Sequence, residues 1–136
     1  MVRKSNQDTQ SKGAGPAPAV EKDGPANLDV EFEAAGQGGG TLRLRYFGPI
    51  ARFPHVWVRF GERREGRDWV EPRDISMTRV GRQASATIPC GAGSTLEGAC
   101  FAFFALNDEG TEAWDSAGRA FGYYRFDVQT GSIEAR

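Results

Sequence analysis

Residues 99–106 read Ala-Cys-Phe-Ala-Phe-Phe-Ala-Leu, and this stretch decides what kind of fold the chain can form. Eight apolar residues in a row are too few to span a membrane, but they match the length of a β-strand. A strand that is apolar on both faces lies inside a sheet, with other elements covering it on each side. We therefore expect residues 99–106 to form a central strand.

The segments around this strand alternate between apolar and polar residues with a period of two. Residues 28–33, 41–47 and 55–60 each show this alternation, which is typical of a strand with one buried face, and residues 83–89 are a further strand candidate. The chain also contains 18 Gly and 7 Pro, which favours many turns. The sequence therefore predicts an all-β fold, an antiparallel β-sandwich of the immunoglobulin-like kind, with seven or eight short strands.

The chain has 136 residues, which is enough for one domain. Residues 1–27 are polar and rich in Pro, Gly and Ala, and cannot bury enough apolar surface to offset their chain entropy. We expect residues 1–27 to be a disordered tail or linker and residues 28–136 to form the sandwich.

Charge and composition argue against several classes of function. The 17 basic residues are balanced by 18 acidic ones, which argues against a nucleic-acid partner, and no apolar run could cross a membrane. The chain has one His and two Cys, which are too few ligands for most zinc sites and leave His55 as the only possible base of a catalytic triad. We expect a protein that is not an enzyme, without cofactor or metal. The absence of a signal-peptide pattern favours the cytoplasm, unless the chain is a fragment of a secreted protein.

Two charged segments are predicted to be loops. Residues 61–67 are charged and flanked by Gly, and residues 107–120 contain a cluster of acids around Trp114. The acids of the second loop are Asp108, Glu109, Glu112 and Asp115. Such a cluster is most often solvated or turn-forming, although Ca²⁺ also takes oxygen ligands from loops.

All three tryptophans lie in polar surroundings, whereas a buried Trp normally sits inside an apolar run. Trp57 shares the polar side of its strand with His55 and Arg59, while Trp69 and Trp114 follow or lie in charged loops. Flat rings on a rigid sheet can stack on the apolar C–H faces of a sugar while neighbouring polar groups bind its hydroxyls. This pattern predicts a carbohydrate ligand, with core packing as the alternative for each Trp taken alone.

A series of short motifs supports the same class of ligand. The motifs are Val58-Arg59-Phe60-Gly61, Trp69 with Pro72, Met77, Ile88-Pro89, Phe103-Phe104-Ala105-Leu106-Asn107-Asp108, Trp114-Asp115 with Gly118, and Tyr123 or Tyr124. Their order over residues 41–128 resembles the starch-binding carbohydrate-binding modules of families twenty-five and fifty-three. The resemblance implies a β-sandwich that binds α-1,4-glucan (starch, glycogen or maltooligosaccharide) without hydrolysing it.

The resemblance also implies which residues bind the ligand. Modules of this kind use a His and two Trp as a sugar platform, and these positions correspond to Arg59, Trp69 and Trp114, with Asp115 beside them. Arg59 stands where the family has its His, and a guanidinium can bind hydroxyls or stack. Ser116 and Ala117 replace the Asn-Asn that follows the family's Trp-Asp.

A second hypothesis is a structural or adaptor domain that decorates a larger assembly. Trp and Arg are enriched at the energetic centres of protein interfaces, so Trp57, Arg59 and Trp69 could meet a protein instead of a sugar. For the weak binding expected of a glucan module, the segment 1–27 would serve as a tether, either to a neighbouring domain or to a larger assembly.

The two cysteines flank a Gly-rich turn. If the strands around residues 91–98 form a hairpin, Cys90 and Cys100 could lie opposite each other and form a disulfide. Two reduced, packed thiols are the alternative, which the lack of a signal sequence favours.

Overall fold

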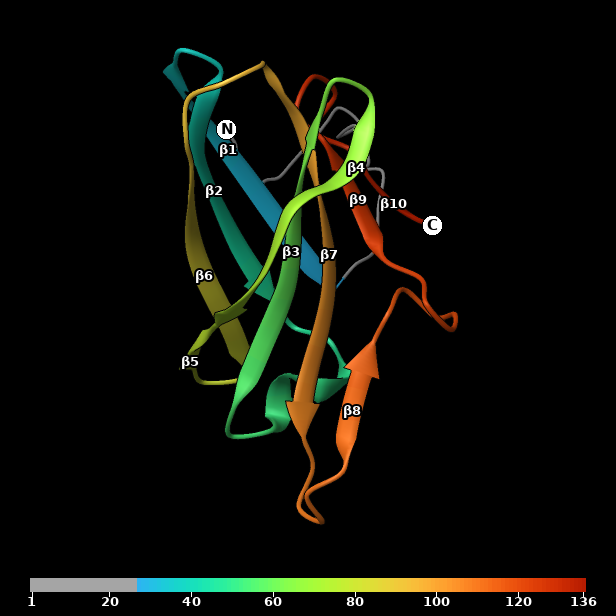
Figure 1. Ribbon diagram of the computed structural model, residues 1–136. Coiled ribbons are helices and arrows are strands. Elements are labelled where there is room, and N and C mark those ends of the chain that lie inside the picture. Colours follow the sequence, from blue (N-terminus) through green and yellow to red (C-terminus); the bar gives the residue numbers. More distant parts are fainter. Residues whose placement is uncertain (1–26) are drawn as a thin grey trace, which may run out of the picture.

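Residues 27–136 are described by a computed structural model, and they form two antiparallel sheets packed face to face (Figure 1). The predicted disordered segment 1–27 lies outside the described residues except for its last residue. Within the described residues, no helix is long and apolar enough to cross a membrane. The predicted antiparallel β-sandwich is confirmed.

The first sheet has four strands in the order β1-β2-β6-β5. Its strands are β1 (Leu28–Gly36), β2 (Gly39–Tyr46), β6 (Gln83–Cys90) and β5 (Thr78–Val80). The alternation that predicted these strands is visible in their burial, because Leu42, Leu44 and Tyr46 of β2 face the interior while Arg43 and Arg45 face solvent. A short 3₁₀ helix, η1 (Pro49–Arg52), follows β2.

The second sheet has the order β10-β9-β7-β3-β4, and β8 pairs with β7 beyond the end of β9. Its strands are β3 (Val56–Arg64), β4 (Arg67–Ser76), β7 (Leu96–Leu106), β8 (Glu112–Asp115), β9 (Tyr124–Asp127) and β10 (Ile133–Ala135). As predicted, residues 99–106 lie inside this sheet, between β3 on one side and β8 and β9 on the other.

The strand order is that of the immunoglobulin fold. In that fold, strands A, B, E and D form one sheet, while G, F, C and C′ belong to the other. The order β1-β2-β6-β5 corresponds to A-B-E-D in the first sheet. The order β9-β7-β3-β4 corresponds to G-F-C-C′ in the second sheet. The predicted immunoglobulin-like topology is therefore confirmed, with β8 as an extra strand in the connection between β7 and β9.

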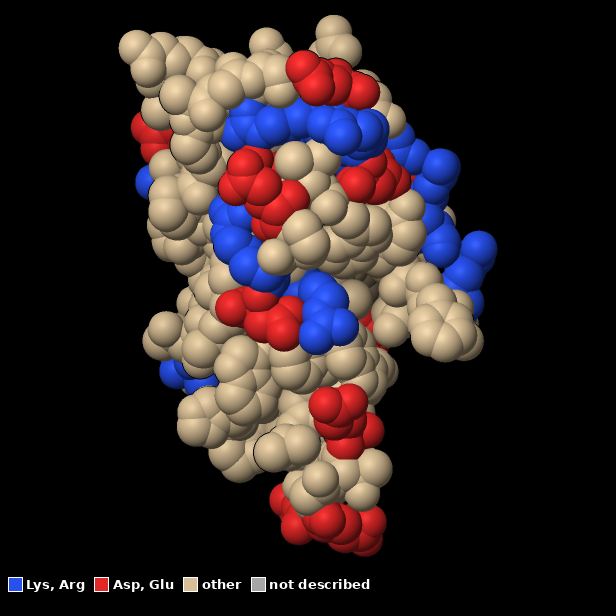
Figure 2. Space-filling model, viewed as in Figure 1, with Lys and Arg blue, Asp and Glu red and all other residues tan. Residues whose placement is uncertain are grey.

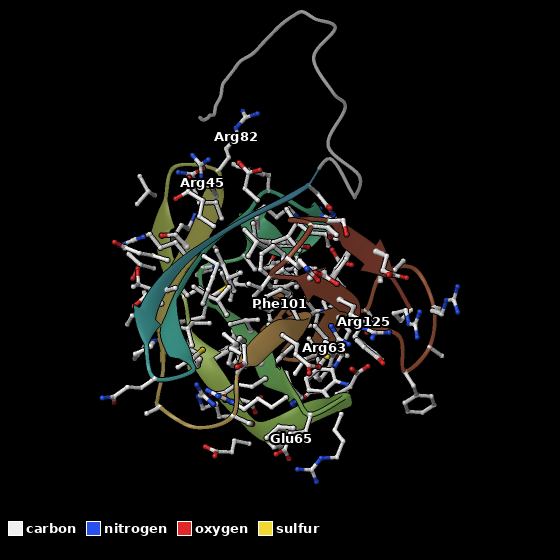
Figure 3. The ribbon with its side chains drawn as sticks, turned by 90° about the horizontal axis from the view of Figure 1, so that it is seen from above. Arg45, Arg63, Glu65, Arg82, Phe101 and Arg125 are labelled. Carbon is white, nitrogen blue, oxygen red and sulfur yellow. The ribbon has the colours of Figure 1, made fainter. Side chains whose placement is uncertain are left out.

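The core lies between the sheets and contains large apolar side chains from both. Phe101 sits at its centre in a view along the strands (Figure 3). The largest fully buried side chains belong to Tyr46, Phe60, Phe101, Phe103, Leu42, Leu44, Ile88, Val58 and Cys100. All but Cys100 belong to the same apolar cluster, so Cys100 is buried on a different side of its sheet.

The prediction that residues 61–67 form a loop is wrong, because β3 continues to Arg64. The guanidinium of Arg64 is buried and donates from Nε to Glu62 Oε1 at 2.6 Å and from Nη2 to the carbonyl of Gly91 at 2.7 Å. Its Nη1 donates to the carbonyls of Gly38 and Ser94. Nε, Nη1 and Nη2 of Arg64 therefore all have acceptors. Because its donors are satisfied, this charged residue can be buried at the end of β3.

Candidate functional site

The outer face of the second sheet, which looks away from the core, carries most of the residues singled out by the sequence. Along β3, Val58 and Phe60 are buried in the core, whereas Trp57 and Arg59 point outward. Figure 2, viewed as in Figure 1, shows basic and acidic side chains interleaved over the upper half of the molecule. At the tip of the β7–β8 connection the charged side chains are acidic.

Four rings on this face stack one on another, and we call His55, Trp57, Phe104 and Trp114 the aromatic ladder. Successive centroids lie 5.3, 5.6 and 4.7 Å apart, with interplanar angles of 18°, 13° and 26°. Trp57 and Phe104 are cross-strand partners, as are Phe104 and Trp114. Trp57 and Phe104 each stack on two rings, whereas Trp114 stacks on one ring only and is 40% exposed.

Arg59 lies beside the Trp114 end of the aromatic ladder. Its Cζ is 5.1 Å from the centroid of the Trp114 ring and 5.5 Å from that of Phe104. Two hydrogen bonds to Asp74, of 2.8 and 3.0 Å, fix the guanidinium. The bond to Asp74 raises the pKa of Arg59, and the same bond lowers the pKa of Asp74. Nη1 of Arg59 has no hydrogen-bond partner within residues 27–136 and remains able to donate.

Trp69 packs against the backbone of β3 at Gly61. A Cβ at residue 61 would lie 2.6 Å from Cε3 of Trp69, so only Gly admits the indole there. The edge of the indole meets Tyr123, with ring centroids 5.2 Å apart and planes at 66°. Trp69 also has φ of +58°, a left-handed backbone that bulky residues rarely adopt. Strain of this kind concentrates at functional sites, and Trp69 is half-buried rather than enclosed in the core.

Asp115 points in the opposite direction from Trp114, because successive side chains of a strand alternate. Asp115 is 9% exposed, and its carboxylate accepts hydrogen bonds of 2.6 Å from the hydroxyls of Tyr46 and Tyr124. Burial and this carboxylate raise the pKa of Tyr124 to about 12 and that of Tyr46 above its ordinary range. Asp115 therefore joins β8 to both sheets from inside, and it does not lie on the outer face with the other predicted ligand residues.

The structure brings Arg59 and Trp114 together and leaves Trp69 further along the same face. Trp69 covers Gly61, whose cross-strand partner is Cys100, and Trp114 pairs with Phe104. The four residue-to-residue steps from Cys100 to Phe104 span about 13 Å of strand. Sequence reasoning missed Phe104 and Tyr123 as parts of this face, although the alternation along 99–106 could have placed Phe104 on it.

The acidic loop around Trp114 is partly a strand, because β8 begins at Glu112. Its acids do not converge: Glu112 accepts a bond of 3.0 Å from the Trp114 indole, Asp115 is buried, and Asp108 and Glu109 are exposed. Within residues 27–136, no three His, Cys, Asp or Glu side chains gather as a metal would require.

Both cysteines are free and buried. Cys90 lies in β6 of the first sheet and Cys100 in β7 of the second, so the hairpin on which the disulfide hypothesis depended does not form. The Gly-rich segment between them instead crosses from one sheet to the other.

Comparisons of the chain with protein-family models, with curated proteins and with solved structures found no match. We therefore infer function from the geometry of the outer face and from the motifs in the sequence.

Proposed function

We propose that this protein is a non-catalytic carbohydrate-binding module that binds α-1,4-glucan on the outer face of its second sheet. Trp69 and Trp114 form the stacking surfaces, and Arg59 donates to sugar hydroxyls between them. The observation that carries the proposal is that two part-exposed tryptophans share one face of a rigid sheet. The cationic Arg59, which is paired with Ala102, lies between them along the strands.

The arrangement around Arg59 suits a ligand that is apolar on one side and polar at its rim. Asp74 holds the guanidinium at one edge, which leaves Nη1 free to donate beside the Trp114 ring. Asp74 and Glu112 offer carboxylate oxygens nearby as acceptors for sugar hydroxyls. Two ring stacks and a few exposed hydrogen bonds sum to about 4–6 kcal/mol, which corresponds to a dissociation constant of roughly 1 mM to tens of μM.

Affinity electrophoresis in gels containing soluble starch or glycogen tests the proposal. The wild-type protein should be retarded, and Trp69→Ala and Trp114→Ala should each weaken binding by about 1–2 kcal/mol. Phe121→Ala is the matched control, because Phe121 is a fully exposed aromatic residue outside the proposed platform. Mobility that polysaccharide leaves unchanged would count against the proposal, as would hydrolysis of the glucan.

The exposure of Phe121 favours the adaptor domain as a second candidate. Its ring is fully exposed, and residue 121 has φ of +59° in the connection between β8 and β9. An aromatic side chain held out in this way is a typical anchor for a protein interface. Concentration-dependent association that Phe121→Ser abolishes would support this function, whereas a strict monomer would weaken it.

A further inference from the structure

Next to Trp69, two arginines share a single carboxylate. Arg63 Nε donates to Asp68 Oδ1 at 2.8 Å, and Arg125 Nε lies 3.7 Å from the same oxygen. The other oxygen of Asp68 accepts a bond of 2.6 Å from the hydroxyl of Tyr123. Figure 3 shows Arg63 and Arg125 side by side, on the side of the second sheet that faces away from Phe101. This group of four side chains therefore carries one positive charge in excess.

The arginines keep hydrogen-bond donors that no residue in 27–136 accepts. Arg63 is only 8% exposed, yet its one hydrogen bond is that from Nε, and both Nη groups are unpartnered within the described chain. In the same part of the chain, the one polar partner of the Arg125 side chain is Asp68, at the longer distance of 3.7 Å. Among the described residues, Oδ1 of Asn27 is the only fully buried side-chain nitrogen or oxygen without a partner, so the Nη groups of Arg63 reach solvent, where water or a ligand can accept from them.

Neighbouring acids do not cancel the excess charge. Glu134 is paired with Arg136 at 3.2 Å, and Asp127 accepts from the backbone N–H groups of Gln129 and Thr130. Asp68 stays ionised: burial raises its pKa, but hydrogen bonds from Tyr123 and Arg63 outweigh burial and lower it overall. Gly98 lets the carbonyl of Phe126 and Nη1 of Arg63 approach the strand closely, since a Cβ at residue 98 would lie 1.9 Å from that oxygen and 3.2 Å from Nη1.

We propose that Arg63 and Arg125 form an oxyanion subsite beside Trp69, which binds the acidic substituent of a hexose whose ring stacks on the indole. This inference deepens the proposed function, because it uses the same Trp69 surface and adds the charge of the ligand. Paired guanidinium groups bind carboxylate and phosphate oxygens through forked hydrogen bonds. One net positive charge matches a singly charged group.

The test is a titration of isotope-labelled protein with glucose, glucuronate, glucose 6-phosphate, inorganic phosphate and maltooligosaccharide at one ionic strength. The indole N–H resonance of Trp69 reports binding. Glucuronate or glucose 6-phosphate should bind about tenfold more tightly than glucose, which is the effect of one charged hydrogen bond. The two acidic sugars distinguish a carboxylate from a phosphate as the favoured substituent.

Arg125→Gln should remove this preference, so that acidic and neutral hexoses bind alike, and Arg125→Lys should restore part of it. Arg125 is the better target because it lies nearer the surface than Arg63, so its variants should fold. Arg45→Gln is the control: Arg45 also pairs with one acid, Asp29, but lies in the first sheet, and both affinities should stay unchanged.

The outcomes separate this proposal from the glucan proposal. If maltooligosaccharide binds but acidic hexoses gain nothing over glucose, the oxyanion subsite is wrong and the glucan proposal stands. If glucuronate binds and maltooligosaccharide does not, the glucan proposal is wrong and the subsite stands. If inorganic phosphate binds as tightly as glucose 6-phosphate, the sugar makes no contribution and the subsite as proposed is overturned.

Discussion

The indole of Trp69 rests on the backbone of Gly61, so close that a methyl group on residue 61 would lie 2.6 Å from Trp69 Cε3 and 2.7 Å from its Cα. Both atoms belong to the neighbouring strand β4, and the second is backbone, so the contact cannot be relieved by a side-chain rotation alone. Trp69 also has a left-handed backbone, with φ of +58°. The position of the indole therefore depends both on this backbone conformation and on the missing side chain at Gly61.

We therefore predict that Gly61→Ala displaces Trp69. The variant should lose about 1–3 kcal/mol of unfolding free energy, as overpacked sites do, and its near-ultraviolet circular dichroism should change. Gly91→Ala is the control, because a Cβ at residue 91 meets nothing within 4 Å. Equal stability of the two variants would show that the contact is not tight.

A second prediction concerns the buried carboxylate of Asp115. Tyr46 and Tyr124 each donate a hydrogen bond of 2.6 Å to it from a different sheet. Tyr46→Phe should cost about 1.5–3 kcal/mol in urea denaturation, because a bond to a buried charge is lost. Tyr123→Phe should cost less, since its bond to Asp68 is only partly buried. A Tyr46→Phe variant as stable as wild type would mean that the carboxylate finds another donor.

Alkaline pH should destabilise the protein through the same tyrosines. Burial and Asp115 raise the pKa of Tyr124 from 10.0 to about 12 in the folded state. Because the folded-state pKa is the higher one, this contribution to stability is complete below pH 10 and is lost as the pH rises toward 12. The pKa of Tyr46 is raised as well, so its contribution has the same sign.

Denaturation midpoints measured across that pH range test the prediction. The midpoint should fall with rising pH in the wild type and fall less steeply in Tyr124→Phe. The buried thiols act in the same direction, so the comparison of variants, rather than the wild-type curve alone, isolates the tyrosine. Parallel curves for the two proteins would contradict the assignment.

The two thiols should be unreactive in the folded protein. Burial raises the pKa of Cys90 and of Cys100 from 9.0 to about 11, and the thiolate is the reactive form. At neutral pH, a thiol reagent should find almost no reactive group in the native state and two per chain after denaturation without reductant. No released thiol would indicate a disulfide and would contradict the separation of the two cysteines onto different sheets.

Sequence reasoning predicted the fold well because strand formation follows local alternation. Residues 28–33, 41–47 and 99–106 each form the strand expected, and the sandwich class follows from their number and spacing. The strand β8 was missed, because Glu112–Asp115 is short and polar and becomes a strand only by pairing with the end of β7.

The candidate site was only partly predictable. The polar surroundings of Trp57, Trp69 and Trp114 indicated tryptophans outside the core, and all three are half-buried or exposed. Arg63 and Arg125 were not singled out, because their meeting at Asp68 requires β9 to lie close to β3 and β4, and Arg125 is far from the other two residues in the chain. No local pattern encodes such a meeting.

By itself, the sequence determined the class of fold and which face of strands such as β2 is buried, because period-two alternation and turn residues act over a few neighbours. Only the tertiary structure decided that Asp115 faces inward while Trp114 faces outward, that the cysteines lie on separate sheets, and that Arg64 is buried. These outcomes depend on which strands pair and on what each side chain meets across the sheet, and those contacts exist only after the chain has folded.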